Sequence, residues 1–136
     1  MNRKEDLRRI RPQILSASVE KTTSLDERFQ NETLRPIIKL QGQLFIEVFK
    51  NYVNKHKNVF YELAIEKRID YIENAIHKDM KFRNSLKGMV IGHFTLEEYS
   101  FYIRNSSALN KRMMQLVKSR LIDNIQLIAL DRRTAI

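Results

Sequence analysis

The stretch that decides the fold lies at residues 65–80 and reads IEKRIDYIENAIHKDM. Its apolar side chains recur every three or four residues, which places them along one stripe of an α-helix, while charged residues occupy the opposite face. The apolar positions are Ile65, Ile69, Ile72, Ala75, Ile76 and Met80, and the polar positions are Glu66, Asp70, Glu73 and His77. The pattern predicts a long amphipathic helix over roughly residues 60–80.

The residues before this stretch repeat the same period. Ser24 to Glu27 form a capping box, in which the serine side chain accepts the amide of the third helical residue. An apolar stripe then runs from Leu34 to Val53. Because Pro36 lacks an amide donor and clashes with the preceding turn, we expect a kink or a fresh helix start near residue 35. The helix should end at residues 54–58, where no apolar side chain continues the stripe.

Three further helical segments follow residue 80. Residues 82–94 keep the helical period and place Gly88 and Gly92 on one face, which predicts close contact with another helix. Thr95 to Glu98 form a second capping box and open a short helix through Ile103. After a turn at residues 104–107, a last helix spans about 108–129. The sequence therefore predicts an all-α protein, a single-domain bundle of four to five helices.

The ends of the chain differ from this bundle. Residues 1–22 hold six basic and three acidic side chains without a sustained period, and we interpret them as a basic mobile arm. The bundle domain spans 23–130, and a polar tail covers 131–136. Neither a signal peptide nor a run of about 20 apolar residues is present, so a cytoplasmic location with no membrane insertion is expected.

Composition narrows the functional classes. The 136 residues contain no Cys, which removes disulfides, thiolate metal sites and cysteine nucleophiles. They contain only three Gly and two Pro, too few for a hairpin-rich β fold. With 25 Lys and Arg against 16 Asp and Glu, the formal net charge is +9. A surface with this excess attracts polyanions such as nucleic acid, although solvated charges also serve solubility alone.

The preferred function is therefore a small basic module that binds nucleic acid or another polyanion electrostatically, with an acidic protein surface as the other partner class. Thr95 to Leu121 also fits a helix-turn-helix, but an ordinary αα-hairpin is the preferred interpretation, because the second helix is long and no glycine marks the turn. The predicted contact residues are Arg8, Arg9, Arg11, Lys81, Arg83, Lys87, Arg104, Lys111, Arg112 and Lys118.

Catalytic signals are weak. The histidines His56, His77 and His93 are scattered, and a metal shared by Glu73 and His77 would lack the second pair that di-iron bundles use. Ser106 and its neighbour Ser107 suit helix capping better than nucleophilic attack, and no glycine-rich loop is present to hold a phosphate. We expect no catalytic residue, metal or cofactor, and a non-enzymatic protein.

An aromatic helix supplies the alternative function. Tyr99, Phe101 and Tyr102 lie so close together on one short helix that they cannot all face the core. One of them should mark an interface, and homodimerisation through this helix is the structural hypothesis. The alternative to polyanion binding is a structural or adaptor protein whose partner docks on Leu96 to Ile103, with the charge serving solubility.

Four segments resemble a group of small, uncharacterised helical bacterial proteins, some of which carry a glyoxalase label. The segments are ETLRPIIKLQ at 32–41, YIENAI at 71–76, FRNSLKGM at 82–89 and NSSALNKRMM at 105–114. The resemblance implies a helical fold over most of residues 1–130, and it supplies no catalytic residue. A glyoxalase-type enzyme is the disfavoured alternative, because such enzymes place their metal ligands on strands.

Overall fold

The computed structural model describes residues 2–14 and 24–128 of the chain. Every regular element among them is helical: eight α-helices, one π-helical turn (η1) and one 3-10 turn (η2). The elements are α1 Arg3–Ile10, α2 Leu25–Phe29, η1 Gln30–Leu34, α3 Arg35–Leu40, α4 Gly42–Lys55, η2 Val59–Glu62, α5 Ile65–Lys78, α6 Met80–Ile91, α7 Leu96–Arg104 and α8 Ser106–Asp123.

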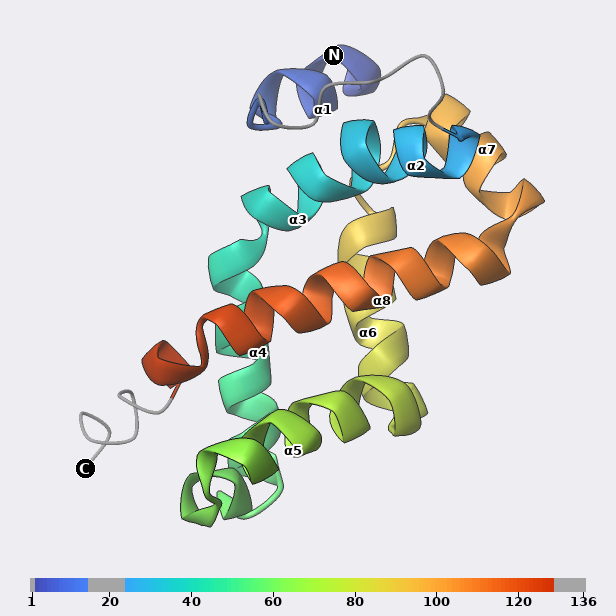
Figure 1. Ribbon diagram of the computed structural model, residues 1–136. Helices are drawn as coiled ribbons and strands as arrows, with labels where there is room; N and C mark the ends of the chain where they lie inside the picture. Colours follow the sequence, from blue (N-terminus) through green and yellow to red (C-terminus); the bar gives the residue numbers. More distant parts are fainter. Residues whose placement is uncertain (1, 15–23, 129–136) are drawn as a thin grey trace.

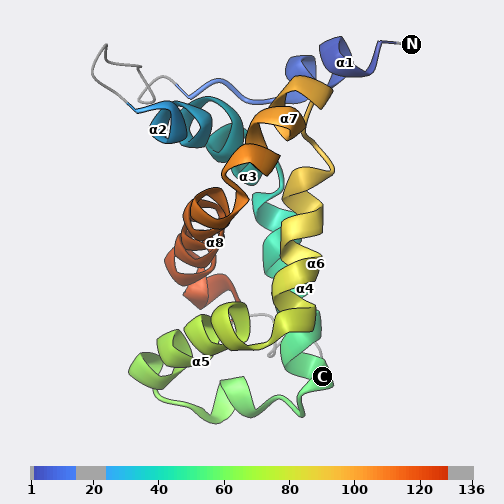
Figure 2. The ribbon, with the colours of Figure 1, turned by 90° about the vertical axis from the view of Figure 1, so that its right-hand side faces the viewer.

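Helix α8 is the centre of the arrangement. It runs across the molecule between α2 and α3 on one side and α5 on the other, while α4 and α6 cross behind it (Figure 1). The view at right angles places α1 and α7 together at one end and α5 at the other (Figure 2). α8 packs against η1, α3, α4, α5, α6 and α7. Five of its side chains are fully or almost fully buried: Leu109, Met113, Met114, Val117 and Leu121.

The expected break near residue 35 takes the form of a π-helical turn. Residues 30–34 form η1, and the amide of Arg35 donates to the carbonyl of Gln30, five residues back. Pro36 follows at the start of α3. Proline has no amide hydrogen to donate, and its ring clashes with the preceding turn of a regular α-helix, so the wider π-helical turn accommodates it. Such interruptions divide the predicted stripes into shorter pieces. The expected count of four to five helices is therefore wrong, although the all-α class is confirmed.

Two aromatic clusters lie at the two ends of the core. Phe49 of α4 is fully buried and contacts the rings of Tyr52, Phe60, Tyr71 and Phe82. At the other end, Phe29 of α2 packs edge-on against Phe94 and stacks on Phe101, with centroid distances of 5.5 and 5.1 Å. The buried side chains of α8 contribute to the same continuous hydrophobic core.

Several local expectations have clear outcomes. Ser24 accepts the amide of Glu27, and Thr95 forms the complete capping box with Glu98. Only Asn105 separates α7 from α8, so the three- or four-residue turn of a helix-turn-helix is not present. The glycine face of α6 is a correction: a methyl group on Gly88 would meet no atom within 4 Å, so this face is open rather than packed on a helix.

The N-terminal segment is attached to the bundle by its arginines. Arg3 donates to the carbonyl oxygens of Phe94 and Gly92, at 2.8 and 3.2 Å. Arg11 donates two bonds of 2.7 Å to the Glu98 carboxylate and one of 2.6 Å to the His93 carbonyl. We call Arg11, Glu98 and the residues bonded to them the Arg11 clasp. Residues 3–10, expected within a mobile arm, thus form a helix beside α7, while residues 15–23 lie outside the described part.

Candidate polyanion-binding groove

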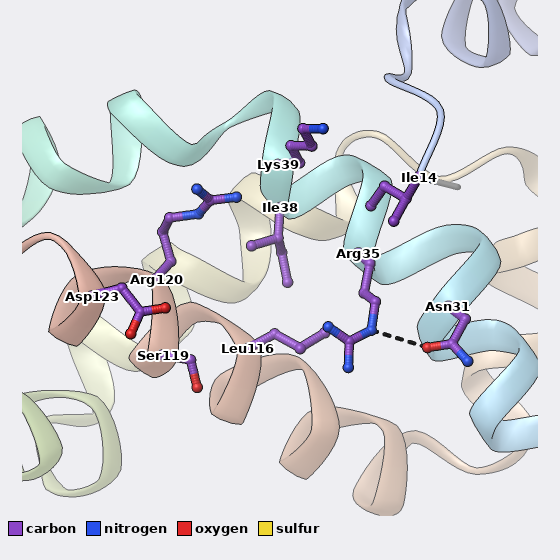
Figure 3. Close-up of a pocket in the computed structure, with 9 residues that line it drawn as sticks. All are labelled: Ile14, Asn31, Arg35, Ile38, Lys39, Leu116, Ser119, Arg120 and Asp123. Atoms are coloured by element: carbon purple, nitrogen blue, oxygen red, sulfur yellow. Dashed lines mark hydrogen bonds between the residues drawn. The ribbon is translucent and has the colours of Figure 1, made fainter. Parts of the chain in front are cut away.

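A groove lined by basic side chains runs between the η1–α3 segment and α8. It consists of two hollows that share Arg35, Leu116 and Ser119. The larger encloses about 600 Å³ and is drawn in Figure 3. Across both, five side chains are cationic and one is a carboxylate. We call these residues the basic groove: cations Arg35, Lys39, Lys111, Arg112 and Arg120, with Asp123 as the carboxylate.

Two groove arginines are held by neutral amides. Arg35 donates from Nε to the side-chain oxygen of Asn31 at 2.9 Å (Figure 3). Arg112 donates from Nη1 to the side-chain oxygen of Gln30 at 2.8 Å. Both amides belong to η1, so the π-helical turn before Pro36 supplies the groups that orient both guanidinium groups.

Among the described residues, no carboxylate pairs with these positive charges. Within residues 2–14 and 24–128, no carboxylate oxygen lies within 4.0 Å of a cationic nitrogen of the five groove side chains. An amide oxygen accepts a hydrogen bond but carries no net charge, so Arg35 and Arg112 are oriented and remain positively charged. The arrangement suits recognition of an anion from outside.

A third arginine reaches across the groove from α8. Arg120 points toward the junction of α3 and α4 (Figure 3). There it lies over Gly42, where an added methyl group would stand 3.2 Å from its Nε atom and 3.3 Å from Cζ. The absence of a side chain at Gly42 therefore makes room for the Arg120 guanidinium. Asp123 lies one turn further along α8 and is exposed.

The predicted contact residues occupy different places. Lys111 and Arg112 line the basic groove. Arg8 and Arg11 line a neighbouring hollow that shares Ile14 and Asn31 with it. Five other predicted residues do not line the groove, and they lie on α1, α6 and α7: Arg9, Lys81, Arg83, Lys87 and Arg104.

Lys118 belongs to a separate basic cluster beside α5. Burial lowers the pKa of His77, and the charges of Lys118 and Arg83 lower it further. The shift indicates that these two cations, from α8 and α6, approach the imidazole of α5. Lys118 and Lys111, both predicted contact residues on α8, therefore have different neighbours.

The side chain of Arg11, another predicted contact residue, is buried in an ion pair. Its side chain is 8% exposed and that of Glu98 is 14% exposed. Burial by itself would raise the pKa of Glu98, but hydrogen bonds from Arg11, the Thr95 amide and the Thr33 hydroxyl hold that pKa below its ordinary value. Glu98 is thus an anion that neutralises Arg11, and the pair attaches the N-terminal segment to α7.

His93 lies beside the clasp. Burial lowers the pKa of His93, and the charges of Arg11 and then Arg3 lower it further. Its Nδ1 atom is buried without a hydrogen-bond partner among the described residues. The surroundings of this imidazole therefore favour its neutral form, since protonation would add a third positive charge next to two arginines.

The three aromatic residues of α7 differ in burial, as their spacing along the helix requires. Tyr102 is buried and donates from its hydroxyl to Asn110 at 2.6 Å. Phe101 is half-buried against Phe29, whereas Tyr99 is exposed. Of the three predicted interface residues, only Tyr99 is therefore exposed.

A further hollow near α5 has a structural explanation. Its carboxylate, Asp79, accepts the Tyr52 hydroxyl at 2.9 Å and the Phe82 amide at 3.2 Å, and these two bonds lower its pKa. The Tyr52 ring contacts His56 and Phe82, each at a centroid distance of 4.1 Å. Asp79 thus caps α6 and ties it to α4, while its aromatic neighbours pack on one another.

Neither a metal-binding group nor a membrane-spanning helix is found among residues 2–14 and 24–128. No group of three or more His, Asp or Glu side chains there has the arrangement of a metal site. None of the helices in the same ranges is long and apolar enough to cross a membrane.

Three groove residues were not singled out from the sequence. Arg35 and Lys39 are four residues apart on either side of Pro36, in a segment with as many acidic as basic residues, so local charge gave no signal. The spacing itself, which places both on one side of α3, is the feature that would have found them. The place of Arg120 in the groove could not be predicted, because the sequence does not show which helices pack against α8.

Comparison with known proteins adds no relative: no family model, curated protein or solved structure matches this chain.

Proposed function

We propose that this protein binds the phosphate backbone of nucleic acid, or another polyanion, in the basic groove between the η1–α3 segment and α8. The observation that carries the proposal is the way Arg35 and Arg112 are held. Each is oriented by a side-chain amide, and neither is neutralised by a carboxylate of the described residues. A phosphate entering the groove would supply the missing negative charge through charge-assisted hydrogen bonds.

The groove favours recognition of phosphates over recognition of bases. Its cations line a hollow between two helices, and η1 and α3 stand opposite α8 across it (Figure 3). Contacts of this kind position a nucleic acid without reading its sequence. We therefore propose binding with little sequence preference and a steep dependence on salt.

The test is fluorescence anisotropy with the full chain and labelled single- and double-stranded DNA and RNA. Binding should be micromolar at about 50 mM salt and weaken steeply by about 300 mM, since each neutralised phosphate contributes about −0.9 to the log–log slope on duplex DNA. Competition by heparin and by inorganic polyphosphate distinguishes nucleic acid from other polyanions. Absence of binding at the lowest salt would contradict the proposal.

Charge reversal localises the site. Arg35→Glu combined with Lys111→Glu should abolish binding, because both side chains line the groove. Lys118→Glu combined with Lys67→Glu is the matched control, with the same change in net charge at residues outside the groove. Equal losses in both double variants would show that net charge, rather than the groove, determines binding.

An exposed apolar strip on α7 favours a second candidate function, the docking of a protein partner. Leu96, Tyr99 and Ile103 lie along this strip and are all exposed. The groove variants separate the two candidates, because charge reversal at Arg35 and Lys111 would leave a partner on α7 in place.

A further inference from the structure

The exposed face of α7 is apolar along its length, and a charged side chain lies near each of its ends. Leu96, Tyr99 and Ile103 are 77%, 46% and 55% exposed. They follow each other at spacings of three and four residues, so they form one stripe, while Phe101 and Tyr102 turn toward the core on the other side of the helix. α7 itself lies at one end of the molecule, beside α1 (Figure 2).

One exposed aliphatic side chain from α2 belongs to the region near the C-terminal end of this stripe. Asn105 donates from Nδ2 to the Asp26 carboxylate at 2.8 Å, which holds the start of α2 beside the C-terminal end of α7. The preceding residue, Leu25, is 65% exposed. Leu25, Leu96 and Ile103 are therefore three highly exposed large aliphatic side chains gathered around one short helix. We call them, with Tyr99, the α7 strip.

Two opposite charges border the α7 strip on one side. Glu97 and Arg104 are seven residues apart, almost two full turns, so they project in nearly the same direction about 10 Å apart along the helix. Arg104 has no carboxylate partner among the described residues, and Glu97 pairs only with the exposed Lys4 at 3.1 Å. The face thus carries a negative charge near its N-terminal end and a positive charge at its C-terminal end.

This face is complementary to itself under a two-fold rotation. When two copies of α7 pack face to face and antiparallel, the two-fold axis keeps the charged side of one copy against the charged side of the other. Glu97 of each copy then meets Arg104 of the second copy, and Leu96 meets Ile103. A symmetric dimer requires such a self-complementary patch, in which each contact occurs twice.

We propose that the α7 strip is the interface of a homodimer, formed by antiparallel packing of α7 on α7 of a second copy and closed by two Glu97–Arg104 ion pairs. A nine-residue helix and the adjoining Leu25 bury less than the roughly 800 Å² per partner of a standard interface. The dimer is therefore weak, with a dissociation constant in the micromolar range, and it exchanges with monomer.

The test is sedimentation velocity of the full chain over a concentration series that reaches about 1 mM, where a micromolar dimer is saturated. The expected result is a rise from the 16.3 kDa of one chain to twice that mass. A mass that stays at one chain over the whole range overturns the proposal and leaves the α7 strip to a partner of another kind.

Charge exchange tests the antiparallel pairing. Arg104→Glu places two carboxylates together at each end of the interface and should weaken the dimer by about tenfold or more. Glu97→Arg should do the same, and the double variant, which restores opposite charges, should recover most of the affinity. Lys67→Glu on α5 is the matched control. A double variant as weak as the single variants overturns the pairing.

Loss of folding is separated from loss of the interface by a second substitution. Tyr99→Glu removes an exposed ring and adds charge at the centre of the strip, so it should abolish the dimer while far-UV circular dichroism and the melting temperature stay close to those of the parent protein. A dimer that survives Tyr99→Glu would show that the two copies meet elsewhere, against the proposal.

Discussion

The arginine of the clasp and the arginines of the basic groove are held in opposite ways. Arg11 is buried and bonded to the Glu98 carboxylate at 2.7 Å, so its charge is neutralised within the protein. Arg35 and Arg112 are each oriented by one hydrogen bond, of 2.9 and 2.8 Å, to the neutral amides of Asn31 and Gln30. The first arrangement attaches one segment of the chain to another. The second leaves an oriented positive charge for an anion that comes from outside.

Loss of the buried arginine should have the largest effect on stability. Arg11→Ala leaves the Glu98 carboxylate buried without its cation, which should lower the free energy of unfolding by about 3 kcal/mol. Chemical denaturation followed by circular dichroism measures it. Arg9→Ala is the matched control, since its partner Asp6 lies on the same helix and both side chains are exposed. If Arg9→Ala lowered the free energy of unfolding as much as Arg11→Ala, the stabilising role of the Arg11 clasp would be contradicted.

Loss of a groove arginine should affect binding rather than folding. Arg35→Ala and Arg112→Ala should each weaken nucleic-acid binding by about 1 kcal/mol and reduce the salt slope by about one phosphate. Arg35 is exposed and Arg112 is half-buried, and neither substitution leaves a buried charge unpaired, so the free energies of unfolding should change by about 1 kcal/mol or less. Salt titrations and denaturation curves on the same samples would check both. A stability loss comparable to that of Arg11→Ala would remove the distinction between the two sites.

Acid should weaken the Arg11 clasp. The lowered pKa of Glu98 means that its contribution to stability is complete above the ordinary carboxyl pKa of 4.5 and is lost as the pH falls below it. The lowered pKa of His93 acts in the same direction nearer neutrality, because the unfolded chain takes up a proton near pH 6.5 before the folded chain does. Stability should therefore fall from pH 7 to pH 5.5, and fall further below pH 4.5.

Replacement of each titrating group checks this assignment. His93→Asn should reduce the decline between pH 7 and pH 5.5, with the remainder due to His77, whose pKa is also lowered. Glu98→Gln should reduce the decline below pH 4.5, with Asp79 contributing in the same direction. Nuclear magnetic resonance titration of the imidazole protons reports the pKa of His93 directly. A His93 pKa above 6.5 would contradict the arrangement of Arg3 and Arg11 around it.

Two glycines offer the smallest test. Gly42→Ala should move the Arg120 guanidinium by a few tenths of an ångström and weaken binding about twofold, because the added methyl group meets Nε at 3.2 Å. Gly88→Ala, on the open face of α6, should stabilise the protein by about 0.5–1 kcal/mol without changing binding. Equal effects on binding at both positions would show that Arg120 is not a contact residue.

The parts of the fold that sequence predicts are those determined by neighbours along the chain. Apolar spacing identified α5, and the capping side chains at Ser24 and Thr95 located two helix starts. Pro36 predicted the break that appears as η1. The number of helices was not predictable, because turns at Gln41 and the η1 segment interrupt stripes whose apolar period continues through them.

The groove was only partly predictable, because its residues come from helices distant in the chain. Lys111 and Arg112 were identified from local charge, whereas Arg35 belongs to a segment with no net charge. Arg11 shows the converse. Its charge was visible in the sequence, but its neutralisation by Glu98, 87 residues away, was not. Net charge predicts that a protein attracts anions, and packing determines which cations are available.

Among the described residues, Arg35 and Arg112 are bonded to amides and to no carboxylate, and the most direct test of the binding site is to supply carboxylates there. Gln30→Glu with Asn31→Asp keeps the shape of both side chains and gives Arg112 and Arg35 the kind of partner that Arg11 has. Salt titrations of nucleic-acid binding should then show affinity at least tenfold lower and a salt slope shallower by about two phosphates, with a melting temperature unchanged or higher. Unchanged affinity and slope in this double variant would contradict the account.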